Sequence, residues 1–324
     1  LEHHDIRPSC ADMDGDGDID LVGAGGPDIV VFENTDGAGT FKAKVAVAMD
    51  IMNFVLADVD ADGLIDIVFD AGGITWSRNL GGNTFDPPVP FPGTVANDRM
   101  VIFMDVEGDG DQDAILLRQP QDLVLLTNLG AGQYGSPIQL ATLTYNTNRI
   151  LHSFDLEGDG DLDILSTYSA IDQECKVLLN TGGGVFTLAT TFTFSGCNGQ
   201  PPNVFTMDLD GDGNVDIVEK FGCVALRKRM GLGNGMFGLP FSLASFTGTI
   251  RRIAMCDLDQ DGLKDIIALS GAKVQGAMNL GGGTFAVPVD LTTEFYTTGS
   301  GLWDMEVVDV DLDGQPELFV VDND

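Results

Sequence analysis

Short apolar segments recur along the chain, and each is bounded by acidic or glycine-rich residues. The segments 101–104, 204–207 and 253–256 each end directly before an acidic stretch. A second apolar stretch follows each acidic one, as in 65–69 and 164–165. Apolar runs between turn residues are typical of buried or half-buried β-strands. The pattern therefore predicts a strand on either side of every acidic stretch.

A glycine turn followed by an aromatic residue closes the next element of the repeat. Looser copies of this turn end at Phe41 and Phe237. The well-defined copies occupy 79–85, 128–134, 180–186 and 279–285. Because Asn and Gly tolerate positive φ, these turns predict β-hairpins that join a third strand to a fourth.

The acidic stretch is itself a nine-residue repeat, D-x-[DE]-x-D-G-x-x-[DE], that occurs seven times at steps of 46 to 53 residues. Four strands per repeat of this length make one propeller blade, whereas an acidic β-helix would repeat about every nine residues. We therefore predict an all-β, seven-bladed β-propeller with four-stranded antiparallel blades, formed by residues 1–324 as one domain.

The last repeat does not fit this scheme completely. Only six hairpin turns are present, and the sequence stops at Asp324, shortly after the second strand of repeat seven. We expect blade seven to be incomplete at this end, and its missing strands to come from residues beyond 324 or from a neighbouring chain. An open blade would leave an unpaired strand edge.

Positions 1, 3, 5 and 9 of the repeat are carboxylates in all seven copies, position 6 is always glycine, and position 7 varies. Carboxylates that converge from one tight turn are hard oxygen ligands, which suit Ca²⁺, and a variable position 7 fits a backbone carbonyl ligand. We predict about seven Ca²⁺ ions, one per repeat. The predicted ligands are Asp12, Asp14, Asp16, Asp18, Asp20, Asp58, Asp60, Asp62, Leu64, Asp66, Asp105, Glu107, Asp109, Asp111, Asp113, Asp155, Glu157, Asp159, Asp161, Asp163, Asp208, Asp210, Asp212, Asn214, Asp216, Asp257, Asp259, Asp261, Leu263, Asp265, Asp309, Asp311, Asp313, Gln315 and Glu317.

An EF-hand, a different metal or a solubilising surface fits the acidic repeat less well. An EF-hand loop closes at position 12 and lies between helices, whereas this repeat closes at position 9 and lies between strands. Magnesium rarely uses an all-protein cage, and zinc or iron would favour His or Cys. A merely solubilising surface would not need like charges at such regular spacing.

The overall charge excludes some functions. The formal net charge is −34, with 50 acidic and 16 basic residues, and phosphate binding needs clustered Lys and Arg. A nucleic-acid ligand is therefore not expected.

No apolar run reaches the 18 or more residues of a membrane helix, so membrane insertion is not expected. The sequence begins at Leu1 and shows no signal peptide, which indicates a processed or trimmed start.

The acidic repeats, together with the aromatic-then-proline turns at 85–87, 134–137, 237–240 and 285–288, resemble FG-GAP or VCBS repeats. Such repeats occur in integrin α-subunit propellers, in a fungal N-acetylglucosamine-binding lectin and in bacterial surface proteins. The resemblance covers nearly the whole chain. It implies a calcium loop between the two innermost strands of each blade, and an extracellular adhesion or recognition role.

Arginine, tryptophan and tyrosine residues supply further candidates for ligand binding. Arg99, Arg149 and Arg251 each lie six residues before the first Asp of a repeat, which makes them candidates for binding an anionic ligand. Arg7 and Arg252 also lie at the entry to predicted first strands, and local pairing with acidic residues is the alternative role of these arginines. Trp76, Trp303, Tyr145 and Tyr296 are candidates either for stacking on sugars or for packing between blades.

Of the five cysteines, Cys10 and Cys256 fall on predicted first strands, where we expect small buried side chains. Cys175, Cys197 and Cys223 fall in predicted loops. Cys197 is expected to pair with either Cys175 or Cys223, and an extracellular location would favour the disulfide.

Three functions fit these observations. The first is a non-enzymatic, extracellular, calcium-binding recognition module for glycans or proteins. The second is a propeller-type polysaccharide lyase or hydrolase, but with three histidines, and with most carboxylates in the acidic repeats, no acid–base constellation stands out. We therefore do not expect an enzyme. The third is a structural module of a surface fibre or a larger assembly.

Overall fold

The computed structural model describes residues 9–25, 28–48, 54–143, 149–168, 173–194, 204–292 and 302–322. Every regular element in these ranges is a β-strand, 26 in total. No helix that could cross a membrane occurs among the described residues. The chain divides into two compact units: one is Leu1–Asn146 with Val308–Phe319, and the other is Thr147–Val307 with Val320–Asp324.

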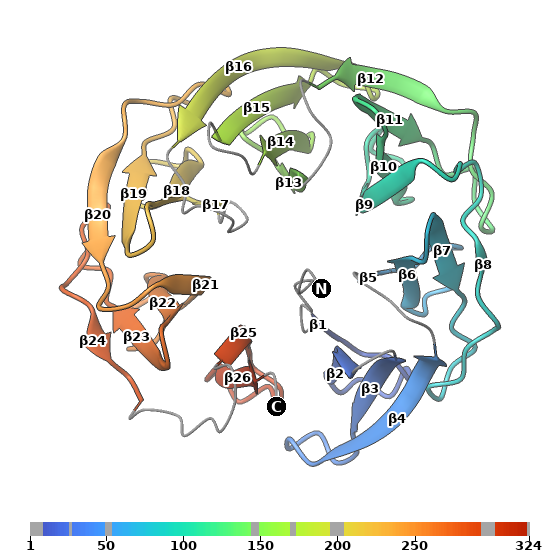
Figure 1. Cartoon of the computed structure of the whole chain (residues 1–324), viewed down its shortest axis with the longest axis horizontal. Coiled ribbons are helices and arrows are strands. Elements are labelled where there is room, and N and C mark those ends of the chain that lie inside the picture. The colour runs from blue at the N-terminus through green and yellow to red at the C-terminus, as the bar shows by residue number, and fades with distance from the viewer. Residues whose placement is uncertain are drawn as a thin grey trace. The chain divides into compact units, whose positions relative to one another are not determined.

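The first unit contains three antiparallel sheets of four strands each, and the strands follow one another in chain order (Figure 1). The first sheet is β1 (Ser9–Ala11), β2 (Asp20–Gly25), β3 (Asp28–Asn34) and β4 (Phe41–Ala48). The second is β5 (Phe54–Ala57), β6 (Asp66–Asp70), β7 (Ile74–Ser77) and β8 (Val89–Pro90). The third is β9 (Asp98–Met104), β10 (Asp113–Arg118), β11 (Asp122–Leu126) and β12 (Ile138–Thr142).

The second unit repeats the same architecture in three more four-stranded sheets. The fourth sheet is β13 (Arg149–Phe154), β14 (Asp163–Tyr168), β15 (Gln173–Asn180) and β16 (Phe186–Phe194). The fifth is β17 (Val204–Met207), β18 (Asp216–Phe221), β19 (Ala225–Arg229) and β20 (Phe241–Ser245). The sixth is β21 (Ile250–Cys256), β22 (Asp265–Ser270), β23 (Lys273–Ala277) and β24 (Val289–Asp290).

The prediction of seven four-stranded blades is wrong: the described chain has six. The seventh acidic repeat lies in a sheet of only two strands, β25 (Leu302–Val308) and β26 (Glu317–Asp322). An acidic repeat requires only the strand before it and the strand after it. A third and a fourth strand need a further hairpin, and the sequence has none after β26. Counting acidic repeats therefore overestimated the number of blades by one.

The predicted hairpins are confirmed. Asn79 pairs with Phe85, Asn128 with Tyr134 and Asn279 with Phe285 across the glycine turns. The two looser turns end as expected, because Asn34 pairs with Phe41 and Gly231 with Phe237. The turns place Gly81, Gly130 and Gly281 at φ values of 79° to 82°, a region that glycine enters without steric cost.

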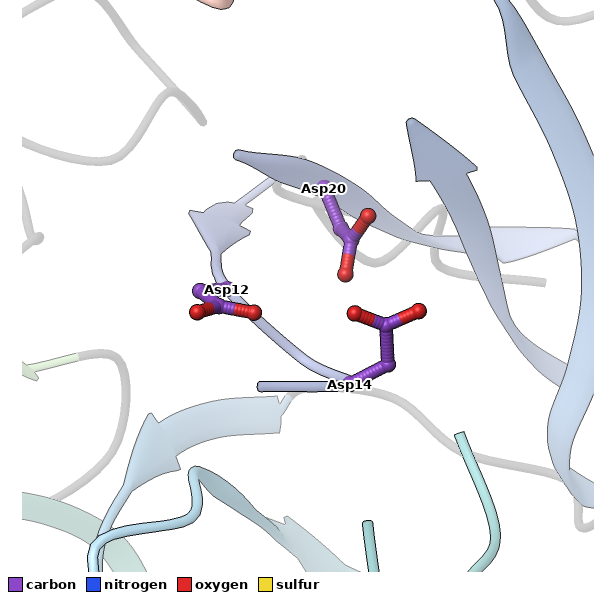
Figure 2. A group of neighbouring side chains, drawn as sticks. All are labelled: Asp12, Asp14 and Asp20. Carbon is purple, nitrogen blue, oxygen red and sulfur yellow. The ribbon is translucent and has the colours of Figure 1, made fainter. Parts of the chain in front are cut away.

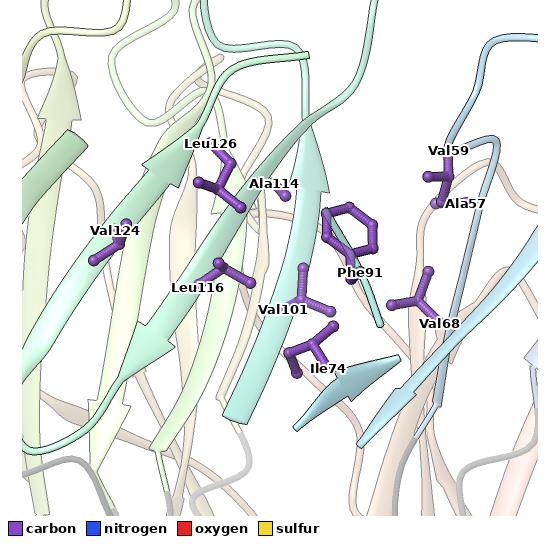
Figure 3. Close-up of a cluster of buried hydrophobic side chains, with 10 residues drawn as sticks. All are labelled: Ala57, Val59, Val68, Ile74, Phe91, Val101, Ala114, Leu116, Val124 and Leu126. Carbon is purple, nitrogen blue, oxygen red and sulfur yellow. The ribbon is translucent and has the colours of Figure 1, made fainter. Parts of the chain in front are cut away.

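Neighbouring sheets within each unit pack face to face. Between the second and third sheets, Val68, Ile74, Phe91, Val101 and Leu116 form part of one buried cluster (Figure 3). The second strand of a sheet carries much of the core in β6, β10, β18 and β22, where four to six successive residues are buried. A strand that is buried on both faces reads as a continuous apolar run, which explains why these segments do not alternate in polarity.

Candidate functional site

All seven acidic repeats connect the first strand of a sheet to its second strand, and we number them in chain order as loops 1 to 7. They span residues 12–20, 58–66, 105–113, 155–163, 208–216, 257–265 and 309–317. Loops 1, 2, 3 and 7 belong to the first compact unit, and loops 4, 5 and 6 belong to the second.

The first Asp of each loop closes the turn in the same way. In loop 1, Asp12 Oδ2 accepts the backbone N–H of Gly17 at 2.9 Å, and the equivalent distance in the other loops is 2.8–3.0 Å. The glycine at position 6 has φ between 88° and 96° in all seven loops, which L-residues rarely adopt. The invariant glycine of the repeat is thus a requirement of this turn.

The carboxylate at position 9 joins the loop to the third strand. In loop 2, Asp66 accepts the backbone N–H of Val59 at 3.0 Å through one oxygen and that of Asn79 at 2.7 Å through the other. The equivalent pair of bonds recurs in all six four-stranded sheets. Asp66 is 0% exposed. Sequence analysis missed this structural role of position 9. Its only sign in the sequence is the Asn that opens most of the hairpins, whose backbone N–H binds this carboxylate.

Carboxylate oxygens converge in five of the loops, where three acidic residues each place an oxygen within 4.8 Å of the others. In loop 1 these are Asp12, Asp14 and Asp20, which face a common point (Figure 2). Loops 5, 6 and 7 hold the equivalent groups from positions 1, 3 and 9, whereas loop 2 brings together positions 1, 3 and 5, which are Asp58, Asp60 and Asp62. Loops 3 and 4 carry Glu at position 3, and in loop 3 the Glu107 carboxyl group hydrogen-bonds to Asp113.

Burial and neighbouring carboxylates raise the pKa of some carboxyl groups in loops 1 to 6. Burial, opposed by two backbone N–H bonds, raises the pKa of Asp66 to about 7, and it raises the pKa of Asp163 to about 6. The pKa of Asp14 is also raised, by burial first and then by the neighbouring Asp20 and Asp16. Asp60 Oδ1 is buried without a hydrogen-bond partner. A cation bound among these oxygens would relieve both the burial cost and the repulsion, so the residues present fit a calcium ion.

A pH effect follows for the metal-free protein. A carboxylic acid whose pKa is raised on folding binds more protons in the folded state than in the unfolded state between its two pKa values. The free energy of unfolding therefore falls as pH rises through that window, which for Asp66 is about pH 4 to 7. In a chelator, the melting midpoint should be higher at pH 5.5 than at pH 7.5. Saturating calcium should remove or reverse this difference, and an equal pH trend with and without calcium would contradict it.

The side chain at position 7 has a packing role that sequence analysis did not foresee. A Cβ added at Gly37 would lie 2.7 Å from Asp18 Oδ1, and one added at Gly233 would lie 2.4 Å from Asn214 Oδ1. Position 7 therefore lies directly against the hairpin glycine of its own sheet. The predicted backbone carbonyl ligand at this position stays a prediction.

The hairpins of the second and sixth sheets also contact the acidic loop of the preceding sheet. Asn79 Nδ2 donates to the carbonyl of Met13 at 2.7 Å, and Gly82 N–H donates to that of Asp14 at 3.3 Å. In the second unit, Gly283 N–H donates to the carbonyl of Leu209 at 2.9 Å. Ordering of a loop is thus linked to packing between neighbouring sheets of the same unit.

The predicted arginine site is only partly described. Arg99 Nη1 donates to the carbonyls of Ala96 and Asp98, both at 3.0 Å, which is a local role. Arg251 lies on β21 and Arg149 begins β13, but the Arg149 side chain and Arg7 lie outside the described residues. Arg252 forms a buried ion pair with Asp304 at 2.5 and 2.9 Å. An anion-binding role for Arg99, Arg149 and Arg251 stays a prediction.

The aromatic and cysteine predictions have mixed outcomes. Trp76 packs against the buried cluster between the second and third sheets, whereas Tyr145, Tyr296 and the Trp303 side chain lie outside the described residues. Cys223 is disulfide-bonded, and Cys175 is a buried thiol on β15, where a loop was expected. The pairing of Cys197 with Cys175 is therefore not formed; Cys197 itself lies outside the described residues.

Three solved structures have a fold similar to that of this chain. Over 89% of its length, the chain is similar to 80% of an Agrocybe aegerita lectin that specifically recognises non-reducing terminal N-acetylglucosamine, with 25% identity and a TM-score of 0.68. It is also similar to the lectin BP39L from Burkholderia pseudomallei, with 13% identity, a TM-score of 0.61 and coverage of 88% of this chain and 84% of that one. The V. cholerae biofilm matrix protein Bap1 matches 98% of this chain with 74% of its own, at 14% identity and a TM-score of 0.51.

The similarities to BP39L and Bap1, at 13% and 14% identity, show the fold alone. No curated protein sequence matches the chain. The family model for the FG-GAP-like repeat matches residues 12–69, 105–166, 155–219 and 257–320, which together make up well over half of the chain. Each matched segment begins at the first Asp of an acidic loop and runs through the next acidic loop it contains into the strand that follows. The chain therefore belongs to the FG-GAP-like repeat family of β-propeller proteins.

Proposed function

We propose that this chain is a non-enzymatic glycan-binding module that works outside the cell and binds calcium in its acidic loops. The similarity to the Agrocybe aegerita lectin over most of both chains carries the proposal, and it makes a terminal N-acetylglucosamine the first ligand to test. BP39L supports the same fold and is also a lectin. The disulfide at Cys223 supports an oxidising, extracellular location.

Calcium has a structural role in this proposal. When bound, the ion would supply the positive charge that the converging carboxylates lack. The residues that would hold it are the three acidic residues of each oxygen group, such as Asp208, Asp210 and Asp216 in loop 5. The loop backbone is already fixed by its Asp and Gly residues, so these carboxylates need little reorganisation to bind.

The hairpins offer a repeated surface for sugar contacts. The residue after the hairpin Asn or Gly is an exposed leucine in four sheets, at Leu80, Leu129, Leu232 and Leu280. These side chains lie beside turns that are rich in glycine and polar residues. An apolar contact surrounded by polar groups suits the faces of a hexose ring, and repetition would allow several weak sites to act together.

A glycan array probed with the calcium-loaded protein tests the proposal. We expect binding to glycans that end in N-acetylglucosamine, and weaker binding by the double variant Leu129→Ser, Leu280→Ser. Val287→Ser is the matched control, since Val287 is exposed but lies outside the hairpin turns. Binding to no glycan by a folded, calcium-loaded protein would contradict the proposal. An unchanged double variant would reject only the leucine surface.

A further inference from the structure

Arg78 reaches the second acidic loop from the end of β7. It directly precedes Asn79, whose backbone N–H donates to Asp66. Its Nε lies 2.6 Å from Asp60 Oδ2, and its Nη2 donates to Asp62 Oδ2 at 2.8 Å. Two carboxylates of the proposed calcium site therefore already have a positive charge beside them.

Only one of the two carboxylate oxygens of Asp60 has a partner. Its side chain is 8% exposed, and Oδ1 is buried without a hydrogen-bond partner. Oxygens of Asp58, Asp60 and Asp62 come within 4.8 Å of one another. A buried carboxylate oxygen that faces other carboxylates is costly unless a cation binds it. Loop 2 thus retains an oxygen for a metal ion in addition to its contact with Arg78.

The residue at the position of Arg78 is not basic in any other four-stranded sheet; it is Glu33, Thr127, Leu179, Met230 or Met278. In loop 1 the position is occupied by the acidic Glu33, which forms an ion pair with Lys44. Asn83 Nδ2 lies 3.3 Å from both Asp14 Oδ2 and Glu33 Oε2, so Glu33 is a close neighbour of that loop. Among the six four-stranded sheets, loop 2 is therefore the one with a basic side chain at this position.

We propose that Arg78 is an internal cation of loop 2 that stabilises the loop without calcium and lowers its affinity for calcium. The inference rests on the proposed calcium binding of the loops. In the metal-free protein, the guanidinium offsets repulsion between Asp60 and Asp62. Once calcium binds, the same charge repels the ion. One unit charge about 5 Å from a divalent ion changes affinity roughly tenfold even at the dielectric constant of water.

The variant Arg78→Gln tests the proposal, because it should raise calcium affinity but lower stability in the absence of calcium. It should bind calcium at loop 2 roughly tenfold more tightly, and it should melt at a lower temperature than the unchanged chain in a chelator. Trp76 is a local reporter, because a Cβ added at Gly132 would meet both Asp60 Cβ at 3.3 Å and Trp76 Cη2 at 3.7 Å. Terbium luminescence excited through tryptophan, in a Trp303→Phe background and displaced by calcium, would measure affinity near Trp76.

Arg99→Gln is the matched control, since that guanidinium donates to backbone carbonyls and not to a loop carboxylate. It should leave terbium and calcium affinity unchanged. Calorimetric calcium titration of Arg78→Gln without the Trp303 change provides a second readout. Calcium binding that is no tighter in Arg78→Gln would overturn this inference and leave the proposed calcium sites standing. No calcium binding by either chain at millimolar concentration would overturn both.

Discussion

Removal of calcium should lower the melting midpoint by roughly 10 °C, or prevent folding. Extracellular calcium modules bind with a Kd of about 10⁻⁴–10⁻³ M, and at ten times Kd one site stabilises the folded state by about 1.4 kcal/mol. Carboxylate oxygens converge in five loops, which would together contribute about 7 kcal/mol. That is comparable with the entire stability of a typical domain, about 5–15 kcal/mol.

Thermal melting with excess chelator and with millimolar calcium measures this effect. Magnesium at the same concentration is the control, because it rarely occupies an all-protein cage and should restore little stability. A midpoint that moves by less than a few degrees between chelator and calcium would show that the loops do not depend on metal for folding.

Asp216→Ala should be the most damaging single substitution in loop 5. Asp216 is 1% exposed, and it accepts the backbone N–H groups of Leu209 at 2.9 Å and Gly231 at 2.7 Å. The substitution leaves both buried donors without an acceptor, at a cost of about 1–3 kcal/mol each, and it also removes a proposed calcium ligand. We expect a loss of roughly 2–6 kcal/mol in the free energy of unfolding, even in chelator.

Asp210→Ala in the same loop is the matched control. Asp210 is exposed and contributes a converging oxygen without joining the loop to the third strand. It should cost about 1.4 kcal/mol in calcium and little in chelator. Denaturant unfolding of both variants, with and without calcium, separates the two roles of the loop. Equal losses for Asp210→Ala and Asp216→Ala would show that position 9 has no role beyond metal binding.

The sequence contained most of the fold because the repeat is strict and local. The acidic turns and the glycine hairpins each fix the strands beside them, so the first three elements of each sheet could be placed from their spacing. The number of blades could not be obtained in this way, because the seventh acidic loop needs only β25 and β26. The absence of a seventh hairpin was the better guide.

The chemistry within the loops was harder to predict. A carboxylate at position 9 looks like any other ligand in the sequence, yet Asp20 and Asp66 are fully buried and bind two backbone N–H groups each. That difference depends on the third strand, which lies about 14 residues away in the chain. The contact of Arg78 with Asp60 is similarly non-local and has no repeated signal.

The number of calcium ions bound per chain is the decisive quantity for the proposed role of the acidic loops. Native mass spectrometry of the metal-free protein, titrated with calcium, would count them. We predict at least five ions, one for each loop in which carboxylate oxygens converge. A folded protein that binds none at millimolar calcium would contradict that role.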